Sequence, residues 1–310
     1  MIKMVVSSIK LNTGRSIPGV GFGTGTSFFN RGDAVADVVK HAYQAGFRSF
    51  DCARIYGTEE GLGRGIAELG VDRSELYVTT KTPDWAWSKE TIVAEVEGCL
   101  KRLKLDYLDL VLHHSPAPRI GAKFMATYLT PEEIKNLPDP LDEAVMDTCR
   151  LQMWLGLQLC VEKGLVRDIG VSNFTVNHLK KLLKNPEVTI TPAVNQVEFN
   201  PYIVDSPIQE YCKQTGILLQ AYAPLGNGKD MLLSDPVLER IGGVHNKTAA
   251  QVALRWSLEL GHCIVTKTEK FDRMKENLDL FNFTLSREEI DQITALNKNK
   301  RNFPDPSQFP

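Results

Sequence analysis

The chain has 310 residues, of which 43% are hydrophobic, so it is long enough to bury a sizeable core and is not expected to be disordered. Its formal net charge is −2, with 36 Lys and Arg against 38 Asp and Glu. This balance lacks the basic field that a nucleic-acid-binding protein or a protein attached to acidic lipid carries. We therefore expect neither nucleic acid nor a membrane among its partners.

Cysteine usage and the start of the chain indicate a cellular compartment. A long chain with dispersed cysteines and no CxxC pair is typical of reduced, cytosolic proteins. The opening MIKMVVSSIK has no signal-peptide shape, and no stretch approaches the ~18 apolar residues of a spanning helix. We expect a cytoplasmic protein. The cysteines are Cys52, Cys99, Cys149, Cys160, Cys212 and Cys263.

The first predicted elements are a hairpin and then a strand in IKLNTGRSIPGVGFGT, with the turn at Asn-Thr-Gly. Asp33 is the expected N-cap of the next helix, which Gly46 ends. A strand over 47–51, a helix over 59–69, a strand in LYVTTK and a helix capped by Ser88 follow. LDLVLHH is typical of a buried strand.

A long mixed stretch, 115–140, then interrupts the alternation of strands and helices. It contains a capping box at Thr130 and Glu133 with Pro131 at the first helical position. Its apolar residues are Phe124, Met125, Tyr128 and Leu129. The stretch is either a lid with its own helix or a surface excursion.

Strands and helices alternate again after this stretch. In chain order we expect a helix ending near Lys163, the strand RDIGV, a helix after Phe174, the strand AVNQVEF, a helix over 207–214, the strand ILLQAYA and the short strand CIVT. Capping boxes at Thr248 with Gln251 and at Ser286 with Glu289 predict two further helices.

About eight strand–helix units favour a parallel sheet with right-handed crossovers. Eight units in about 300 residues fit a closed barrel better than the alternative, an open doubly wound α/β sheet. No linker or composition shift divides the chain. We predict an α/β protein with a single domain over 1–310: a (β/α)8 TIM barrel with an N-terminal β-hairpin and a long loop after strand 4.

Chemistry in such barrels sits at the C-terminal ends of the strands. A strand end that only packs needs no polar set, and these predicted ends have one. The residues are Asp51, Lys81, His113, His114, Ser172, Asn173, Gln196, Glu198, Tyr222, Thr266 and Lys267. Tyr56, five residues past Asp51, can lie over the same mouth.

Asp51, Tyr56, Lys81 and a histidine make a coherent acid site. Reduction of a carbonyl leaves an alkoxide that needs a proton, and an ordinary tyrosine, with a pKa of about 10, is a poor acid. A lysine ammonium lowers that pKa, an aspartate holds the lysine charged, and a histidine polarises the carbonyl. Each residue alone also has an ordinary structural role, so the joint position at successive strand ends carries the interpretation.

Strings along nearly the whole chain resemble, in order, segments of the aldo-keto reductase family. They are GVGFGT, DCARIYGTEEGLGRGI, YVTTK, LKLDYLDLVLHHSP, GLVRDIGVSNF, AVNQVEFNP, LLQAYAPLG and VTKTEKFDRMKENL. The resemblance is to aldose reductase-like, NADPH-dependent carbonyl reductases. It implies reversible reduction of an aldehyde or ketone to an alcohol by hydride transfer, in a monomer or weak dimer that uses no metal.

The resemblance implies that Asp51, Tyr56, Lys81 and His114 are catalytic, with Tyr56 as proton donor and His114 orienting the carbonyl. Tyr56 and His114 would also contact the substrate. His113 is assigned to packing, because consecutive strand residues face opposite sides.

NADPH or NADP+ is the implied cofactor. The residues implied to bind it are Thr24, Asp51, Ser172, Asn173, Gln196, Tyr222, Leu225, Gly226, Lys267, Thr268, Arg273, Glu276 and Asn277. Tyr222 would stack on the nicotinamide. Lys267, Thr268 and Arg273 would hold the 2′-phosphate. The structural alternatives are a core aromatic for Tyr222 and a solvated helix start for the phosphate group.

In such relatives the loop after PLG folds over the pyrophosphate like a belt, and its slow opening limits cofactor release. The corresponding segment here, 227–234, is short and brings only Lys229, so we expect no slow belt.

The sequence departs from the family around the substrate pocket. Gly25, Pro83 and Ser115 stand where large aromatic residues are frequent, so we expect a wide mouth. Nearby aromatic residues could rebuild part of the wall: Phe28, Phe29, Trp85 and Trp87. The identity of the carbonyl substrate stays open. The alternative function is that of a cofactor-binding, non-catalytic relative, such as a potassium-channel subunit or a lens crystallin.

Overall fold

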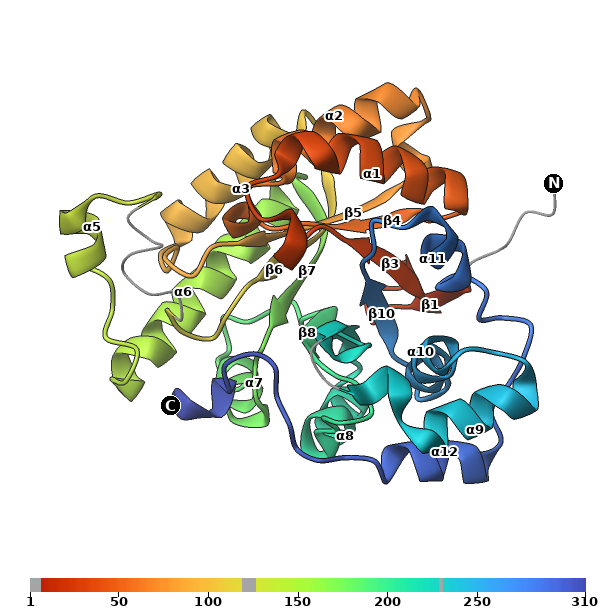
Figure 1. Cartoon of the computed structure of the whole chain (residues 1–310). Coiled ribbons are helices and arrows are strands. Elements are labelled where there is room, and N and C mark those ends of the chain that lie inside the picture. Colours follow the sequence, from red (N-terminus) through yellow and green to blue (C-terminus); the bar gives the residue numbers. More distant parts are fainter. Residues whose placement is uncertain (1–6, 119–126, 229–230) are drawn as a thin grey trace.

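Eight parallel strands close into a barrel in the order β10-β3-β4-β5-β6-β7-β8-β9 (Figure 1). The computed structural model describes residues 7–118, 127–228 and 231–310. The barrel strands are β3 (Val20–Gly23), β4 (Ser49–Asp51), β5 (Tyr77–Thr82), β6 (Leu108–His113), β7 (Val166–Ser172), β8 (Val194–Glu198), β9 (Leu218–Tyr222) and β10 (Cys263–Thr266). The predicted (β/α)8 barrel is confirmed. Because Ile264 of β10 pairs with Val20 of β3, the open sheet is excluded.

Helices cover the outside of the barrel (Figure 1). They are α1 (Gly32–Ala45), α2 (Glu59–Leu69), α3 (Lys89–Leu103), α6 (Glu143–Glu162), α7 (Val176–Leu183), α8 (Ser206–Thr215), α9 (Pro236–His245) and α10 (Ala249–Glu259). Three more are α5 (Pro131–Lys135), α11 (Phe271–Glu276) and α12 (Arg287–Thr294). The short helix α5 lies in the long loop after β6, away from the barrel at the left of Figure 1.

Local capping explains most of the helix starts. The predicted capping boxes at Thr130, Thr248 and Ser286 are all present. The predicted cap at Asp33 is wrong, because α1 begins at Gly32 and its N-cap is Arg31. The Asp33 carboxylate instead accepts a hydrogen bond of 2.6 Å from Arg64 of α2, a long-range pairing that local sequence does not show.

The N-terminal hairpin, β1 (Ser8–Lys10) with β2 (Ser16–Pro18), closes the amino-terminal end of the barrel. Its buried side chains Leu11 and Ile17 join a core cluster with strand residues such as Tyr77, Leu110 and Cys263. Apolar side chains therefore fill this end.

The cysteine thiols and the lengths of the helices are two further features of the described residues. All six cysteines lie in the described part and are free thiols. No helix in the described ranges has the length and apolarity needed to cross a bilayer.

Candidate active site

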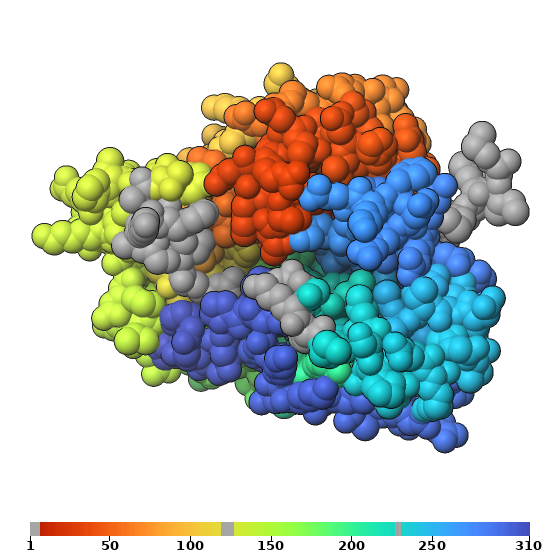
Figure 2. Space-filling view, viewed as in Figure 1, coloured from red at the N-terminus to blue at the C-terminus, as the bar shows by residue number. Residues whose placement is uncertain are grey.

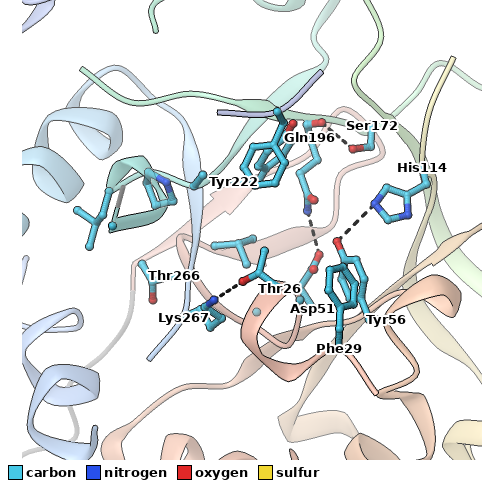
Figure 3. Close-up of a pocket in the computed structure, with 18 of the residues that line it drawn as sticks. Thr26, Phe29, Asp51, Tyr56, His114, Ser172, Gln196, Tyr222, Thr266 and Lys267 are labelled. Carbon is cyan, nitrogen blue, oxygen red and sulfur yellow. Dashed lines mark hydrogen bonds between the residues drawn. The ribbon is translucent and has the colours of Figure 1, made fainter. Parts of the chain in front are cut away.

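A cavity of about 420 Å³ opens at the carboxyl ends of the barrel strands (Figure 3). The ends of every barrel strand except β5 contribute to its wall, because parallel strands bring their carboxyl ends to the same face. The predicted strand-end and cofactor residues that line it are Asp51, Tyr56, His114, Ser172, Asn173, Gln196, Tyr222, Leu225, Thr266, Lys267 and Arg273. Eleven residues from separate segments of the sequence thus meet around one space.

Lys81 lies directly behind this wall and is fully buried. Its Nζ donates to Oδ1 of Asp51 at 2.5 Å and to the carbonyl oxygen of Cys52 at 3.1 Å. The same nitrogen is 5.2 Å from the ring centroid of Tyr56. Burial lowers the pKa of Lys81, but the nearby Asp51 and Tyr56 outweigh burial and raise the pKa overall. Lys81 is therefore a cation at neutral pH, aimed at the tyrosine.

Tyr56 and His114 meet at the cavity surface. Tyr56 belongs to a single 3-10 turn, Arg54–Tyr56, that follows β4. Its hydroxyl oxygen lies 3.4 Å from Nε2 of His114, and the two rings meet edge to face (Figure 3). His114 comes directly after β6, and its backbone carbonyl accepts a hydrogen bond of 2.9 Å from Asn173. The arrangement leaves two polar side-chain atoms side by side at one wall of the cavity.

His113 and His114 have opposite surroundings, as the assignment of His113 to packing requires. His113 is buried against the edge of Trp87, and its Nδ1 lies 2.8 Å from the Thr82 hydroxyl. Burial lowers the pKa of His113 to about 3, so its imidazole is neutral. It does not line the cavity.

The adjoining wall is a chain of amide and hydroxyl groups at the ends of β7, β8 and β9. Gln196 donates from Nε2 to Oδ2 of Asp51 at 2.9 Å, and Ser172 donates to the Gln196 carbonyl at 2.8 Å. The Tyr222 hydroxyl donates to Oδ1 of Asn173 at 2.8 Å. Asn173 itself has a φ of 63°, a left-handed conformation that asparagine tolerates better than most residues. Hydrogen bonds thus fix the orientation of this polar wall.

A segment near the C-terminus closes one side of the mouth. The Phe303 ring lies edge-on to Tyr222, with the centroids 5.2 Å apart. The carboxylate of Glu198, at the end of β8, accepts backbone hydrogen bonds from Asn302 at 2.8 Å and from Phe303 at 3.3 Å. Burial raises the pKa of Glu198, although these two backbone bonds oppose the rise. Glu198 therefore holds the segment that places Phe303.

Lys267 lines the cavity away from His114 (Figure 3), and Arg273, on the helix α11 that follows the same loop, also lines it. Lys267 directly follows β10, and its Nζ donates to the hydroxyl of Thr26. Burial lowers the pKa of Lys267. Within the described part of the chain, neither Lys267 nor Arg273 forms an ion pair with a carboxylate. This end of the cavity therefore suits an anion.

Five of the predicted cofactor residues do not line the cavity. They are Thr24, Gly226, Thr268, Glu276 and Asn277. Thr24 is buried and donates to the Asp51 carbonyl at 3.1 Å, so it supports the strand end from beneath. Glu276 accepts a hydrogen bond of 2.6 Å from Thr248, and Thr268 accepts one of 3.1 Å from the Lys270 backbone. The predicted Lys229 contact lies outside the described residues.

Several lining residues were missed by sequence reasoning: Thr26, Ile55, Leu233, Val265 and Phe303. Phe303 had a weak signal, as a lone aromatic residue in the polar tail KNKRNFPDP. The others had none, because only the folded chain brings their loops to the mouth.

The three departures from the family have different surroundings. Gly25 lines the cavity, and a Cβ placed on it would come within 3.1 Å of the Tyr56 ring. Pro83 and Ser115 do not line it, and the Ser115 hydroxyl closes a local turn onto Ala117. Of the three departures, only Gly25 therefore lies at the cavity.

The nearby aromatic residues behave differently from one another. Phe29 lines the cavity, with its ring centroid 5.2 Å from that of Tyr56. Trp85 stacks on Tyr128 of the long loop, and neither lines the cavity. Phe28 and Trp87 are buried and also do not line it. Phe124 and Met125, named as candidate lid residues, lie outside the described residues.

Comparison with known proteins finds relatives over almost the full chain. The model of the Aldo/keto reductase family matches residues 19–298. The chain is 40% identical to the glyoxal reductase of Bacillus subtilis over 302 residues, which cover 97% of each protein. It is 34% identical to an aldehyde reductase of Saccharomyces cerevisiae, with 96% of this chain and 93% of that protein covered.

Solved structures similar to this chain include aldo-keto reductases. An aldo-keto reductase of Bombyx mori in complex with NADP is similar, with a TM-score of 0.81, 33% identity, and 97% of this chain and 98% of that one covered. An aldo-keto reductase from a deep-sea metagenome library gives a TM-score of 0.81 at 33% identity, covering 96% of this chain and 98% of that one.

Proposed function

Because this chain belongs to the aldo/keto reductase family, we propose that it reduces an aldehyde or ketone to an alcohol with NADPH, and that Tyr56 donates the proton. The observation that carries the proposal is the group of Asp51, Lys81, Tyr56 and His114 at one wall of the cavity. The reaction is reversible, so the same residues also serve alcohol oxidation.

The donor set of the cavity fits a nicotinamide dinucleotide phosphate. Ser172, Asn173 and Gln196 offer amide and hydroxyl groups beside the catalytic wall, where a carboxamide can be bound. Lys267 and Arg273 offer two cations at the other end, where a 2′-phosphate can be bound. A similar aldo-keto reductase has been solved with NADP, which supports this choice of cofactor.

NADPH, when bound, supplies the hydride that reduces the carbonyl carbon. The Tyr56 hydroxyl and His114 Nε2 lie 3.4 Å apart, so a substrate oxygen that enters beside them can accept hydrogen bonds from both. His114 thereby orients and polarises the carbonyl, and Tyr56 gives its proton to the oxygen as it becomes an alkoxide. The Lys81 ammonium stabilises the phenolate that remains, and Asp51 holds Lys81 in place.

The complete catalytic group favours an enzyme over the non-catalytic alternative. A buried lysine paired with a carboxylate behind a cavity-facing tyrosine is costly to maintain for packing alone. A subunit or crystallin that only binds cofactor needs the polar wall and the cationic end but not this pair.

We infer that the substrate is a small-molecule carbonyl compound with an apolar part. Phe29, Ile55 and Phe303 line the cavity together with Tyr56 and His114, so apolar surface adjoins the reacting groups. Burial of apolar substrate surface against such a wall contributes to binding.

The decisive experiment is steady-state NADPH oxidation with a panel of aldehydes and ketones, followed by NADP+ reduction with the matching alcohols. We expect turnover of several carbonyl compounds. A protein that binds NADPH tightly but turns over no member of either panel would establish the non-catalytic alternative.

We further propose a single-domain, cytoplasmic monomer or weak dimer, because surface charge is balanced and the cysteines are unpaired. Sedimentation at rising protein concentration tests the oligomeric part. A stable tetramer at every concentration would contradict it.

A further inference from the structure

Two loops from opposite ends of the sequence lie side by side at the cationic end of the cavity. One connects β3 to α1, and the other connects β10 to α11; they are the red and bright blue surfaces that touch in Figure 2. Two contacts join them. Lys267 donates to the Thr26 hydroxyl, and Arg31 forms an ion pair with Glu269.

The Arg31 guanidinium is held in a fixed orientation. Its Nη1 donates to Oε1 of Glu269 at 3.0 Å and its Nη2 to Oε2 at 3.4 Å, so both carboxylate oxygens are engaged. Nη1 also donates to the Ser27 carbonyl at 3.1 Å, and the guanidinium lies 5.8 Å from the Phe28 ring centroid. This two-point geometry is available to arginine and not to lysine.

The position of Glu269 is unfavourable for a bound phosphate. Glu269 lies in the same short loop as Lys267 and precedes Arg273, the two cations proposed for the 2′-phosphate. Burial lowers the pKa of Lys267, and the Glu269 carboxylate partly opposes that shift. The charge of Glu269 therefore acts on Lys267 at this site. A free carboxylate here would repel the phosphate of NADP and would not affect NAD in the same way.

We infer that Arg31 is a cofactor-specificity residue that acts through Glu269: it cancels the carboxylate charge beside the 2′-phosphate site. Arg31 does not line the cavity, whereas Lys267 and Arg273 do, so neutralisation of Glu269 accounts for its role better than direct contact with the phosphate. The inference rests on the proposed NADPH site and adds the N-cap residue of α1 to it.

The expected effect of losing Arg31 on the affinity for NADP+ is modest. The Arg31 and Glu269 side chains are 49% and 46% exposed, so water and salt screen their charges. We expect a change of up to about fivefold in affinity, which is the upper end of the range found for exposed charge pairs.

Fluorescence titrations of the full chain with NADP+ and with NAD+ test the inference. Arg31→Gln should weaken NADP+ up to about fivefold and leave NAD+ within about twofold. Glu269→Gln should bind NADP+ at least as tightly as wild type. In the Arg31→Gln/Glu269→Gln double variant the penalty of losing Arg31 should vanish, because no carboxylate remains to be neutralised. In ~1 M salt, where the Debye length is about 3 Å, the Arg31→Gln penalty should shrink.

Arg64→Gln is the control, because Arg64 also pairs with a carboxylate at the start of helix α1, that of Asp33, at an exposed site. It should leave both affinities unchanged. Equal weakening of NADP+ and NAD+ by Arg31→Gln, or an unchanged penalty in the Glu269→Gln background, would overturn the inference.

The affinities of wild type and Arg273→Ala for NADP+ and NAD+ test the proposed cofactor site itself. If wild type prefers NADP+ and Arg273→Ala removes that preference while Arg31→Gln does nothing, only the inference is wrong. If wild type binds NADP+ and NAD+ equally and Arg273→Ala changes neither, the proposed site is wrong and the inference is wrong with it.

Discussion

The ammonium nitrogen of Lys81 lies 2.5 Å from a carboxylate oxygen of Asp51, and the two side chains are 0% and 7% exposed. Removing both charges from water costs several kcal/mol, which their attraction repays only in good geometry. Such a pair therefore contributes little net stability, while loss of one partner leaves a buried charge. A double-mutant cycle on unfolding free energy can therefore detect the pair, because one single substitution destabilises the protein more than replacement of both residues.

Asp51→Asn should lower the free energy of unfolding by about 3–5 kcal/mol, because the buried Lys81 loses the counter-ion that offsets its burial. The Lys81→Met/Asp51→Asn double variant should recover most of that loss, since no buried charge remains. Urea unfolding at neutral pH measures both. Additive losses from the two single substitutions would show that the pair is not electrostatically coupled.

Tyr56→Phe should bind NADPH as wild type does and lose about 10² to 10⁴ of the rate of carbonyl reduction, the usual contribution of a positioned acid. The ring that faces Phe29 and His114 remains, and only the hydroxyl is removed. Single-turnover reduction under saturating NADPH measures the chemical step directly. Retention of more than about a tenth of the rate, with chemistry limiting, would exclude Tyr56 as the proton donor.

Arg273→Ala should weaken NADPH about tenfold and leave NADH nearly unchanged. A charge-assisted hydrogen bond contributes about 1.5–3 kcal/mol, and the exposed position of Arg273 reduces that figure. Lys267→Met should add to the loss, because Lys267 lines the same end of the cavity. Affinities from fluorescence quenching decide the matter, and an equal loss for both cofactors would contradict the assignment.

Gly25 controls the width of the mouth beside Tyr56, so wild type should turn over carbonyl compounds larger than small aldoses. Gly25→Trp should reduce kcat/KM for a bulky aromatic ketone at least about tenfold more than for a small aldehyde, as expected for loss of a few kcal/mol of pocket contacts. The small aldehyde is the internal control, because a Cβ at position 25 also approaches the Tyr56 ring at 3.1 Å and slows every substrate. Equal losses for both substrates would mean that only Tyr56 moved.

Local patterns were enough to predict the barrel and most of the polar strand-end residues that line its cavity. Helix α2 has the predicted bounds, because its amphipathic run ends at Gly70, whose φ of 62° suits glycine. The predicted N-cap of α1 was wrong: the Asp33 carboxylate accepts a hydrogen bond from Arg64, a residue far along the chain, and does not cap the helix. Phe303 was missed for the same reason, because its position at the mouth depends on two hydrogen bonds from the backbone of its segment to the distant Glu198. Residues placed by long-range polar contacts have no local period to reveal them.

The loop after β9 also has features that bear on cofactor release. Its described part contains two 3-10 turns, Gly226–Gly228 and Met231–Ser234, and both contribute residues to the cavity wall, Gly228 and Leu233. Leu232 is fully buried, and Asp235 accepts a hydrogen bond of 2.8 Å from the Tyr202 hydroxyl. The end of the loop nearest α9 is therefore fixed to the core.

A loop this short and fixed at one end has little reach, since a chain spans at most about 3.3–3.6 Å per residue. We expect NADPH to bind in one fast step without a slow isomerisation, and chemistry to contribute to kcat instead of lid opening alone. Stopped-flow quenching of tryptophan fluorescence should show a single phase whose rate rises linearly with NADPH concentration. NADPH deuterated at the transferred position should lower kcat measurably. A slow, concentration-independent second phase together with no isotope effect on kcat would show that the loop closes over the cofactor and that its opening limits turnover.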